Sequence, residues 1–141
     1  MFTTTSSGAR PLPRAAATFV NDTYEEEPYD DREGTVLGRI HITRSFDGDL
    51  QGTATAELLT ATTESGSAAY VAFDRITARL HARTGSFVLQ HHGTISSAGS
   101  AIDGAVVPDS ATGELRGLRG TGEISVQQGT HHLTLDYELD G

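Results

Sequence analysis

Several features that carry common chemistries are missing from this sequence. It contains no cysteine, which excludes disulfide scaffolds, thiolate zinc sites and cysteine nucleophiles. Every basic side chain other than histidine is arginine, so no lysine is available to form a Schiff base. No apolar run approaches the roughly 18 residues that a transmembrane helix needs, and we therefore predict no membrane association.

The charge balance is strongly acidic. Nineteen acidic residues face ten arginines, which gives a net charge of −9 over 141 residues. A surface of this sign repels phosphate backbones, so the sequence predicts that nucleic acid is not a partner. The hydrophobic share of 36% and the charged share of 21% are typical of a globular domain.

The chain length fits one domain with one core. Residues 1–14 are polar and interrupted by Pro11 and Pro13, so we predict a flexible N-terminal tail rather than a signal peptide. Residues 15–141 are predicted to form a single domain. The missing signal peptide and the missing cysteines together predict a cytoplasmic location.

Strand patterns recur at intervals of roughly ten residues, with glycine-rich or acidic turns between them. No helical apolar stripe competes with them. The predicted strands cover residues 17–22, 35–46, 50–60, 70–80, 85–95, 102–107, 120–126 and 130–139. The sequence thus predicts an all-β protein, a small closed antiparallel β-barrel of about eight strands, because closure removes the exposed edges of a sheet.

Alternation within these strands predicts which side chains face the interior. On residues 50–60 the inward set contains the small residues Ala54 and Ala56, which leave space inside the barrel. Asp74 and His91 fall on the inward faces of consecutive strands. Space lined by apolar groups with a few polar ones is typical of a small-molecule site.

Asp74 and His91 are the candidate catalytic residues. A buried carboxylate needs a partner, and it would hold a neighbouring histidine in one tautomer and make it more basic. Such a pair is suited to general acid–base chemistry on a bound ligand. The alternative is a satisfied polar pair that closes one end of the barrel without touching a ligand.

No metal or cofactor is expected. The histidines at 91–92 and 131–132 form doublets, and adjacent residues of a strand point to opposite faces. A doublet therefore cannot chelate one ion within a regular strand, and the spacing matches no known zinc pattern.

Five segments in order along the chain resemble one protein family, the domain of unknown function 3224. They are EPY at 27–29, SFDGDLQG at 45–52, GSFVLQH at 85–91, GELRGLRG at 113–120 and LTLDY at 133–137. The resemblance implies an allene oxide cyclase-like barrel with a cavity, and it implies no established reaction. The sequence departs from the family pattern at Asp74, where members usually carry glutamate, and at His91, which is followed by a second histidine.

The predicted ligand is an apolar small molecule in the barrel cavity. An acidic stretch, residues 22–33, is read either as a solvated loop or as a lid that brings Tyr24 or Tyr29 inward. The predicted ligand-binding residues are Tyr29, Ala54, Ala56, Tyr70, Leu89 and Tyr137.

Two classes of function stay open at this point. By resemblance to allene oxide cyclase, the protein is a cofactor-independent cyclase or isomerase that shapes a flexible apolar substrate. The alternative is a non-catalytic carrier, sensor or structural barrel. Val71, Phe73 and Val88 form a predicted outward apolar patch, which favours a homo-oligomer, a dimer or trimer.

Overall fold

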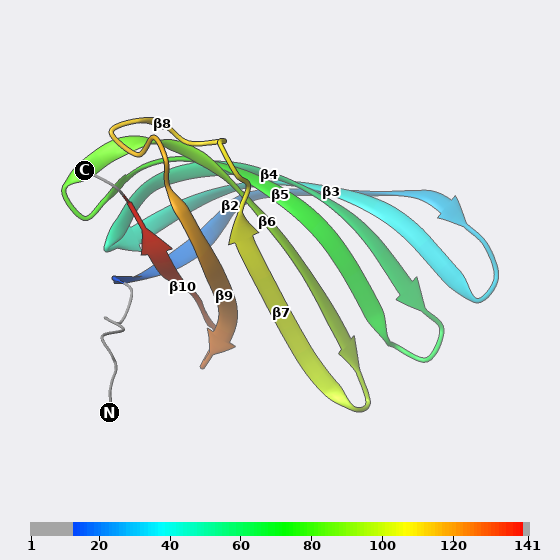
Figure 1. Cartoon of the computed structure of the whole chain (residues 1–141). Helices are drawn as coiled ribbons and strands as arrows, with labels where there is room; N and C mark the ends of the chain where they lie inside the picture. The colour runs from blue at the N-terminus through cyan, green and yellow to red at the C-terminus, as the bar shows by residue number, and fades with distance from the viewer. Residues whose placement is uncertain (1–12, 140–141) are drawn as a thin grey trace, which may run out of the picture.

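The computed structural model describes residues 13–139, and its regular elements are all β-strands (Figure 1). The eight longer strands are β2 (Arg14–Asp31), β3 (Thr35–Gly48), β4 (Leu50–Thr63), β5 (Ala68–Leu80), β6 (Arg83–Ser96), β7 (Gly99–Val106), β9 (Arg119–Gln127) and β10 (Thr130–Glu138). A short strand, β8 (Thr112–Gly113), pairs with β6. Of the predicted tail, residues 1–12 lie outside the described residues, and Arg14 already belongs to β2.

The longer strands close into the predicted antiparallel barrel. Each pairs with its neighbour in the ring β2–β3–β4–β5–β6–β7–β9–β10, and β10 returns to β2. The described residues include no helix long and apolar enough to span a bilayer. The sequence-based prediction of an all-β barrel is therefore confirmed.

The acidic stretch forms part of the barrel wall. The prediction of a short strand over 17–22 followed by a loop was wrong, because β2 runs for 18 residues through Asp31. Its partners on β3 extend from Gly48 to Val36, so the backbone groups of the acidic residues are held in a ladder. The pairing shifts register between Asn21 and Thr23, and again between Pro28 and Asp30.

The interior contains two apolar clusters. One fills the end of the barrel that carries the β3–β4 and β5–β6 turns, where the segment between β7 and β9 inserts Leu115 and Leu118, both almost fully buried. The other lies toward the opposite end and consists of Ile40, Ile42, Ala56, Leu58 and Ala72, with Tyr70 packed against it. The barrel is thus closed at one end by its own side chains.

The opposite end is open because the strands there differ in reach. β10 meets β2 no further than the pair His131–Phe19, so the rest of β2 has no partner on that side. The long strands β2 to β6 extend beyond the β9–β10 hairpin (Figure 1). A mouth is left between the projecting β2 edge and the β6–β7 hairpin.

The outward apolar patch differs from the predicted one in its residues. Val71 and Phe73 are more than half exposed on β5, as expected, and Leu59 on β4 lies beside them. Val88 is half-buried, because the chain after β7 covers it and its N–H donates a hydrogen bond to Ser110 Oγ. The homo-oligomer stays a prediction.

Candidate functional site

Three polar side chains form a buried layer between the two apolar clusters. They are Arg44 on β3, Asp74 on β5 and His91 on β6, exposed by 6%, 2% and 4%. Each occupies an inward position of an alternating strand, as Asp74 and His91 were predicted to do. Since charged side chains are rarely buried without partners, their mutual contacts decide whether this layer is stable.

Contacts join these side chains into a continuous chain. His91 Nε2 lies 2.7 Å from Asp74 Oδ1, and Arg44 Nε lies 2.9 Å from Asp74 Oδ2. His91 Nδ1 lies 2.8 Å from the Tyr70 hydroxyl. The order of the chain is therefore Arg44, Asp74, His91 and Tyr70, and it runs from the buried layer toward the open end.

Arg44 reaches Asp74 across β4. Strands two places apart in a sheet are roughly 10 Å apart, so the guanidinium must pass over the intervening strand. The residues there are Ala54 and Ala56, opposite Arg44 and Asp74 respectively, and their small side chains leave the path open. The guanidinium carbon also lies 5.1 Å from the centre of the Phe19 ring, a cation–π contact.

The contacts define one proton position in the layer. The carboxylate of Asp74, paired with Arg44, can only accept, so His91 Nε2 carries the hydrogen that it donates to Oδ1. His91 Nδ1 forms the hydrogen bond with the Tyr70 hydroxyl at 2.8 Å. Arg44 and Asp74 compensate each other's charge. Arg44 Nε has no hydrogen bond of acceptable geometry among the described residues, so its attraction to Asp74 is that of an ion pair.

Two glycines make room for the tyrosine and the histidine. A Cβ on Gly93 would lie 2.7 Å from Tyr70 Cε1, and a Cβ on Gly104 would lie 3.0 Å from His91 Cβ. The first distance is shorter than real side chains tolerate, and the second is tighter than most real Cβ contacts. Gly93 and Gly104 therefore permit the positions of Tyr70 and His91.

A cavity of about 740 Å³ occupies the open end of the barrel above this layer. Its apolar lining includes Ile40, Leu58 and Ile102, and Tyr70 contributes the connection to His91. Asp74 and His91 do not line the cavity. Of the four side chains from Arg44 to Tyr70, Tyr70 is thus the one that can contact a ligand directly.

The predicted ligand-binding residues are dispersed. Tyr70 lines the cavity, whereas Tyr29 is 54% exposed and lies outside its lining. Ala54, Leu89 and Tyr137 belong to the cluster at the closed end, and Ala56 lies beside Asp74 in the second cluster. The space expected beside the two alanines is the path that Arg44 takes. A ligand contact by any of the six stays a prediction.

Sequence reasoning missed Arg44 and Glu26, and it turned Tyr24 inward only as part of a lid. Arg44 interrupts the inward series Ile40, Ile42 and Phe46, and one charge on an otherwise apolar face was the available signal. Tyr24 and Glu26 face the cavity because of the register shift after Asn21, for which the sequence contains no comparable signal.

Among residues 13–139, no group of three or more histidine and acidic side chains is placed to hold a metal ion.

Alkaline titration should identify Tyr70 among the four tyrosines. Burial, with a smaller contribution from Asp74 that Arg44 opposes, raises the pKa of Tyr70 to about 12. Because the folded-state pKa lies above the unfolded value near 10, the stability linked to this proton is present below about pH 10 and is lost as the pH rises toward 12. The ultraviolet difference titration of wild type against Tyr70→Phe should show a transition near pH 12, and one near pH 10 would contradict this environment.

The sequence and the fold were compared with those of known proteins. A family model described as "Protein of unknown function (DUF3224)" matches residues 15–137. A solved structure of a DUF3224 protein of unknown function from Shewanella oneidensis MR-1 is 32% identical and has a TM-score of 0.78. The match covers 92% of this chain and 99% of that one. The search of curated proteins found no match.

Proposed function

The chain belongs to the DUF3224 family, whose name assigns no reaction, and from the site itself we propose that the barrel binds an apolar small molecule in the cavity at its open end. The observation that carries this proposal is the cavity of about 740 Å³ with aliphatic side chains over its floor and Tyr70 as a polar group. Ligand pockets have this size and this mixture of apolar and polar groups.

A cavity probe tests the proposal without knowledge of the natural ligand. N-phenyl-1-naphthylamine, which fluoresces in apolar surroundings, should bind the wild type. Thr60 points into the cavity, so Thr60→Trp should weaken binding of the probe at least tenfold. Its neighbour Leu59 points outward from the same strand, and Leu59→Trp is the matched control, with unchanged affinity. Equal effects of the two variants, or no binding to the wild type, would overturn the proposal.

Catalysis is the second candidate, and the chain of contacts from Arg44 to Tyr70 favours it. A carrier needs no buried charges, whereas a cofactor-independent isomerase or cyclase needs a group that exchanges hydrogen bonds with a polarised substrate. Because the pKa of Tyr70 is about 12, its hydroxyl is protonated near neutral pH and acts as a donor or acceptor rather than as a phenolate. His91 and Asp74 would act as positioning residues that orient this hydroxyl.

The catalytic candidate has its own test. Native mass spectrometry identifies what co-purifies with the protein, and that compound is then incubated with purified enzyme and separated by chromatography. Isomerisation leaves the mass unchanged and alters the retention time. Tyr70→Phe should abolish the change while N-phenyl-1-naphthylamine still binds. Unaltered retention with the wild type would leave binding as the function.

A further inference from the structure

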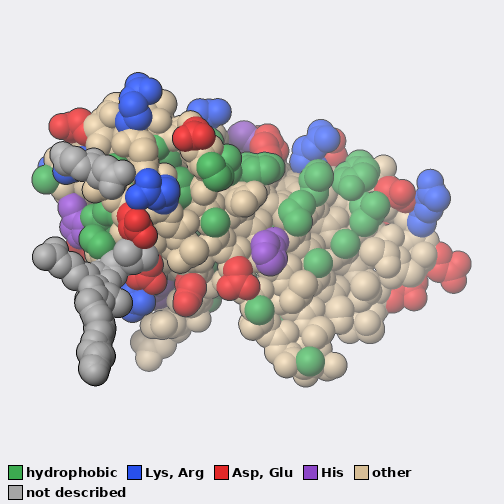
Figure 2. Space-filling view, viewed as in Figure 1, with side chains coloured by type: hydrophobic (Ala, Val, Ile, Leu, Met, Phe, Trp, Pro, Cys, Tyr) green, Lys and Arg blue, Asp and Glu red, His purple; other side chains and the backbone are tan. Residues whose placement is uncertain are grey.

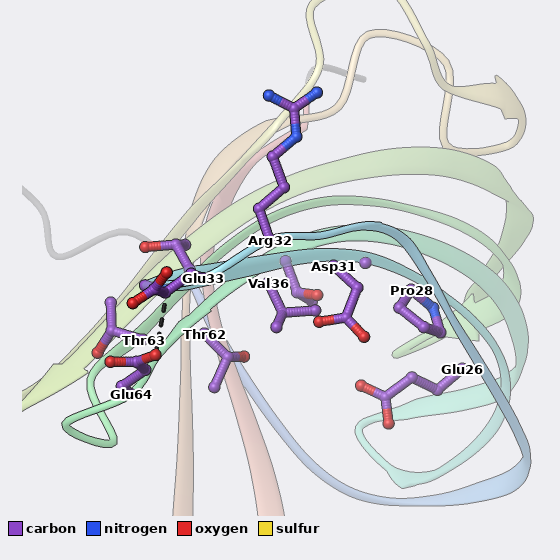
Figure 3. Close-up of a pocket in the computed structure, with 13 residues that line it drawn as sticks. Glu26, Pro28, Asp31, Arg32, Glu33, Val36, Thr62, Thr63 and Glu64 are labelled. Atoms are coloured by element: carbon purple, nitrogen blue, oxygen red, sulfur yellow. Dashed lines mark hydrogen bonds between the residues drawn. The ribbon is translucent and has the colours of Figure 1, made fainter.

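The register shift in β2 turns one carboxylate into the cavity. After the shift, Glu26 pairs with Ile40, whose side chain is buried in the barrel. Directly opposed residues of an antiparallel pair share a face, so Glu26 points to the interior side. Figure 3 shows its side chain directed back under the β2–β3 hairpin.

Glu26 is the charged residue in the lining of the cavity. The other lining side chains are aliphatic, aromatic, hydroxyl-bearing or glycine, and none is an arginine or a histidine. No ion pair of Glu26 occurs among the described residues. The carboxylate also affects a neighbour: burial raises the pKa of the Tyr24 hydroxyl, and the charge of Glu26 adds to the rise. The cavity thus combines aliphatic and hydroxyl-bearing walls with one solvent-exposed carboxylate that has no ion-pair partner among the described residues.

A second cavity continues from the first toward the β2–β3 hairpin. It measures about 620 Å³ and shares Glu26, Thr60 and Thr62 with the first. Its further acidic lining residues are Asp31, Glu33 and Glu64. Polarity therefore changes from an apolar floor beside Tyr70 to an acidic outer part.

Arg32 also lines the second cavity, but it leaves this acidity in place. Arg32 pairs with Asp30 at 3.0 Å, its side chain is 84% exposed, and it extends away from Glu26 and Asp31 (Figure 3). Acidic side chains also gather at the end of the molecule where the hairpin lies (Figure 2). With a net charge of −9, the field at the mouth attracts cations and repels anions.

We infer that the ligand is an apolar molecule that ends in a protonated amine, with the amine against Glu26 and the apolar body over Tyr70. The inference rests on the proposed function and adds the charge class of the ligand. An anionic ligand, such as a carboxylate, would meet Glu26 with no cation in the cavity lining to offset it.

Three probes of one shape test the charge preference: 3-phenylpropylamine, 3-phenylpropanol and 3-phenylpropanoate, measured by calorimetry. The amine should bind at least tenfold more tightly than the alcohol, and the carboxylate should bind most weakly. Glu26→Gln should bring the amine to the affinity of the alcohol and leave the alcohol unchanged. Glu25→Gln is the matched control, because Glu25 pairs with His41 on the outer face and should preserve most of the preference.

The outcomes separate this inference from the proposed function. Equal affinity for amine and alcohol overturns the charge class and leaves the cavity as a binding site. Equal losses in Glu25→Gln and Glu26→Gln overturn the role of Glu26, since the attraction would then be that of the whole acidic surface. Failure of the amine to bind where N-phenyl-1-naphthylamine binds also overturns the inference. Failure of N-phenyl-1-naphthylamine itself overturns the proposed function.

Discussion

Replacement of Asp74 by asparagine is expected to lower the free energy of unfolding by about 3 kcal/mol or more. The substitution keeps the volume of the side chain but removes the charge that faces Arg44, which is 6% exposed. A guanidinium left unpaired at that depth cannot recover its hydration. His91→Gln leaves the Arg44–Asp74 ion pair in place and should cost less, about 1–2 kcal/mol, for the hydrogen bonds lost. Urea denaturation measures both.

The chain offers a matched control for this experiment. His41 Nδ1 and Glu57 Oε1 are 2.8 Å apart, a histidine–carboxylate contact of similar length on the solvent side. Because both side chains are well exposed, Glu57→Gln should cost less than about 1 kcal/mol. A loss of similar size in Asp74→Asn would contradict the burial of the layer.

A second substitution tests why Asp74→Asn loses stability. If the unpaired arginine causes the loss, Arg44→Met in the Asp74→Asn background should restore part of the stability, since no charge then remains in the layer. Additive losses would mean that packing, rather than the orphaned charge, is responsible. If Asp74→Asn loses much stability but binds N-phenyl-1-naphthylamine with unaltered affinity, the role of Asp74 is to stabilise the barrel alone.

Gly85→Ala should also destabilise the protein strongly, by about 3 kcal/mol. A Cβ at this position would clash with the carbonyl oxygen of Thr112, in the strand β8 that pairs with β6 there. The clash is with backbone, so rotation of a side chain cannot relieve it. The displaced segment also carries Leu115, which fills the closed end.

Gly122→Ala is the comparison for this variant. Its added methyl group would meet Leu133 Cδ1 at 3.5 Å, an ordinary contact, and the change should stay within about 1 kcal/mol. Thermal or urea unfolding of the two variants side by side measures the difference. Equal stability of Gly85→Ala and Gly122→Ala would show that β8 can move away from the added methyl group without loss of stability.

Local alternation was sufficient to predict the barrel class and the facing of most strands. Ala54, Asp74 and His91 were all placed inward from their positions in alternating strands, and all three are buried. The pairing of Asp74 with His91 also followed, because consecutive strands joined by a short turn lie side by side. These properties depend on near neighbours in the sequence, which a single chain displays.

The tertiary structure alone decided the remaining features. Acidic residues after Asn21 have little preference for strands, and they form β2 because β3 offers them a ladder. Arg44 meets Asp74 across an intervening strand, and Glu26 faces the cavity through a register shift. Register shifts and contacts across a strand depend on how the whole sheet closes, since closure sets the stagger of every strand at once. No local pattern of residues carries that information.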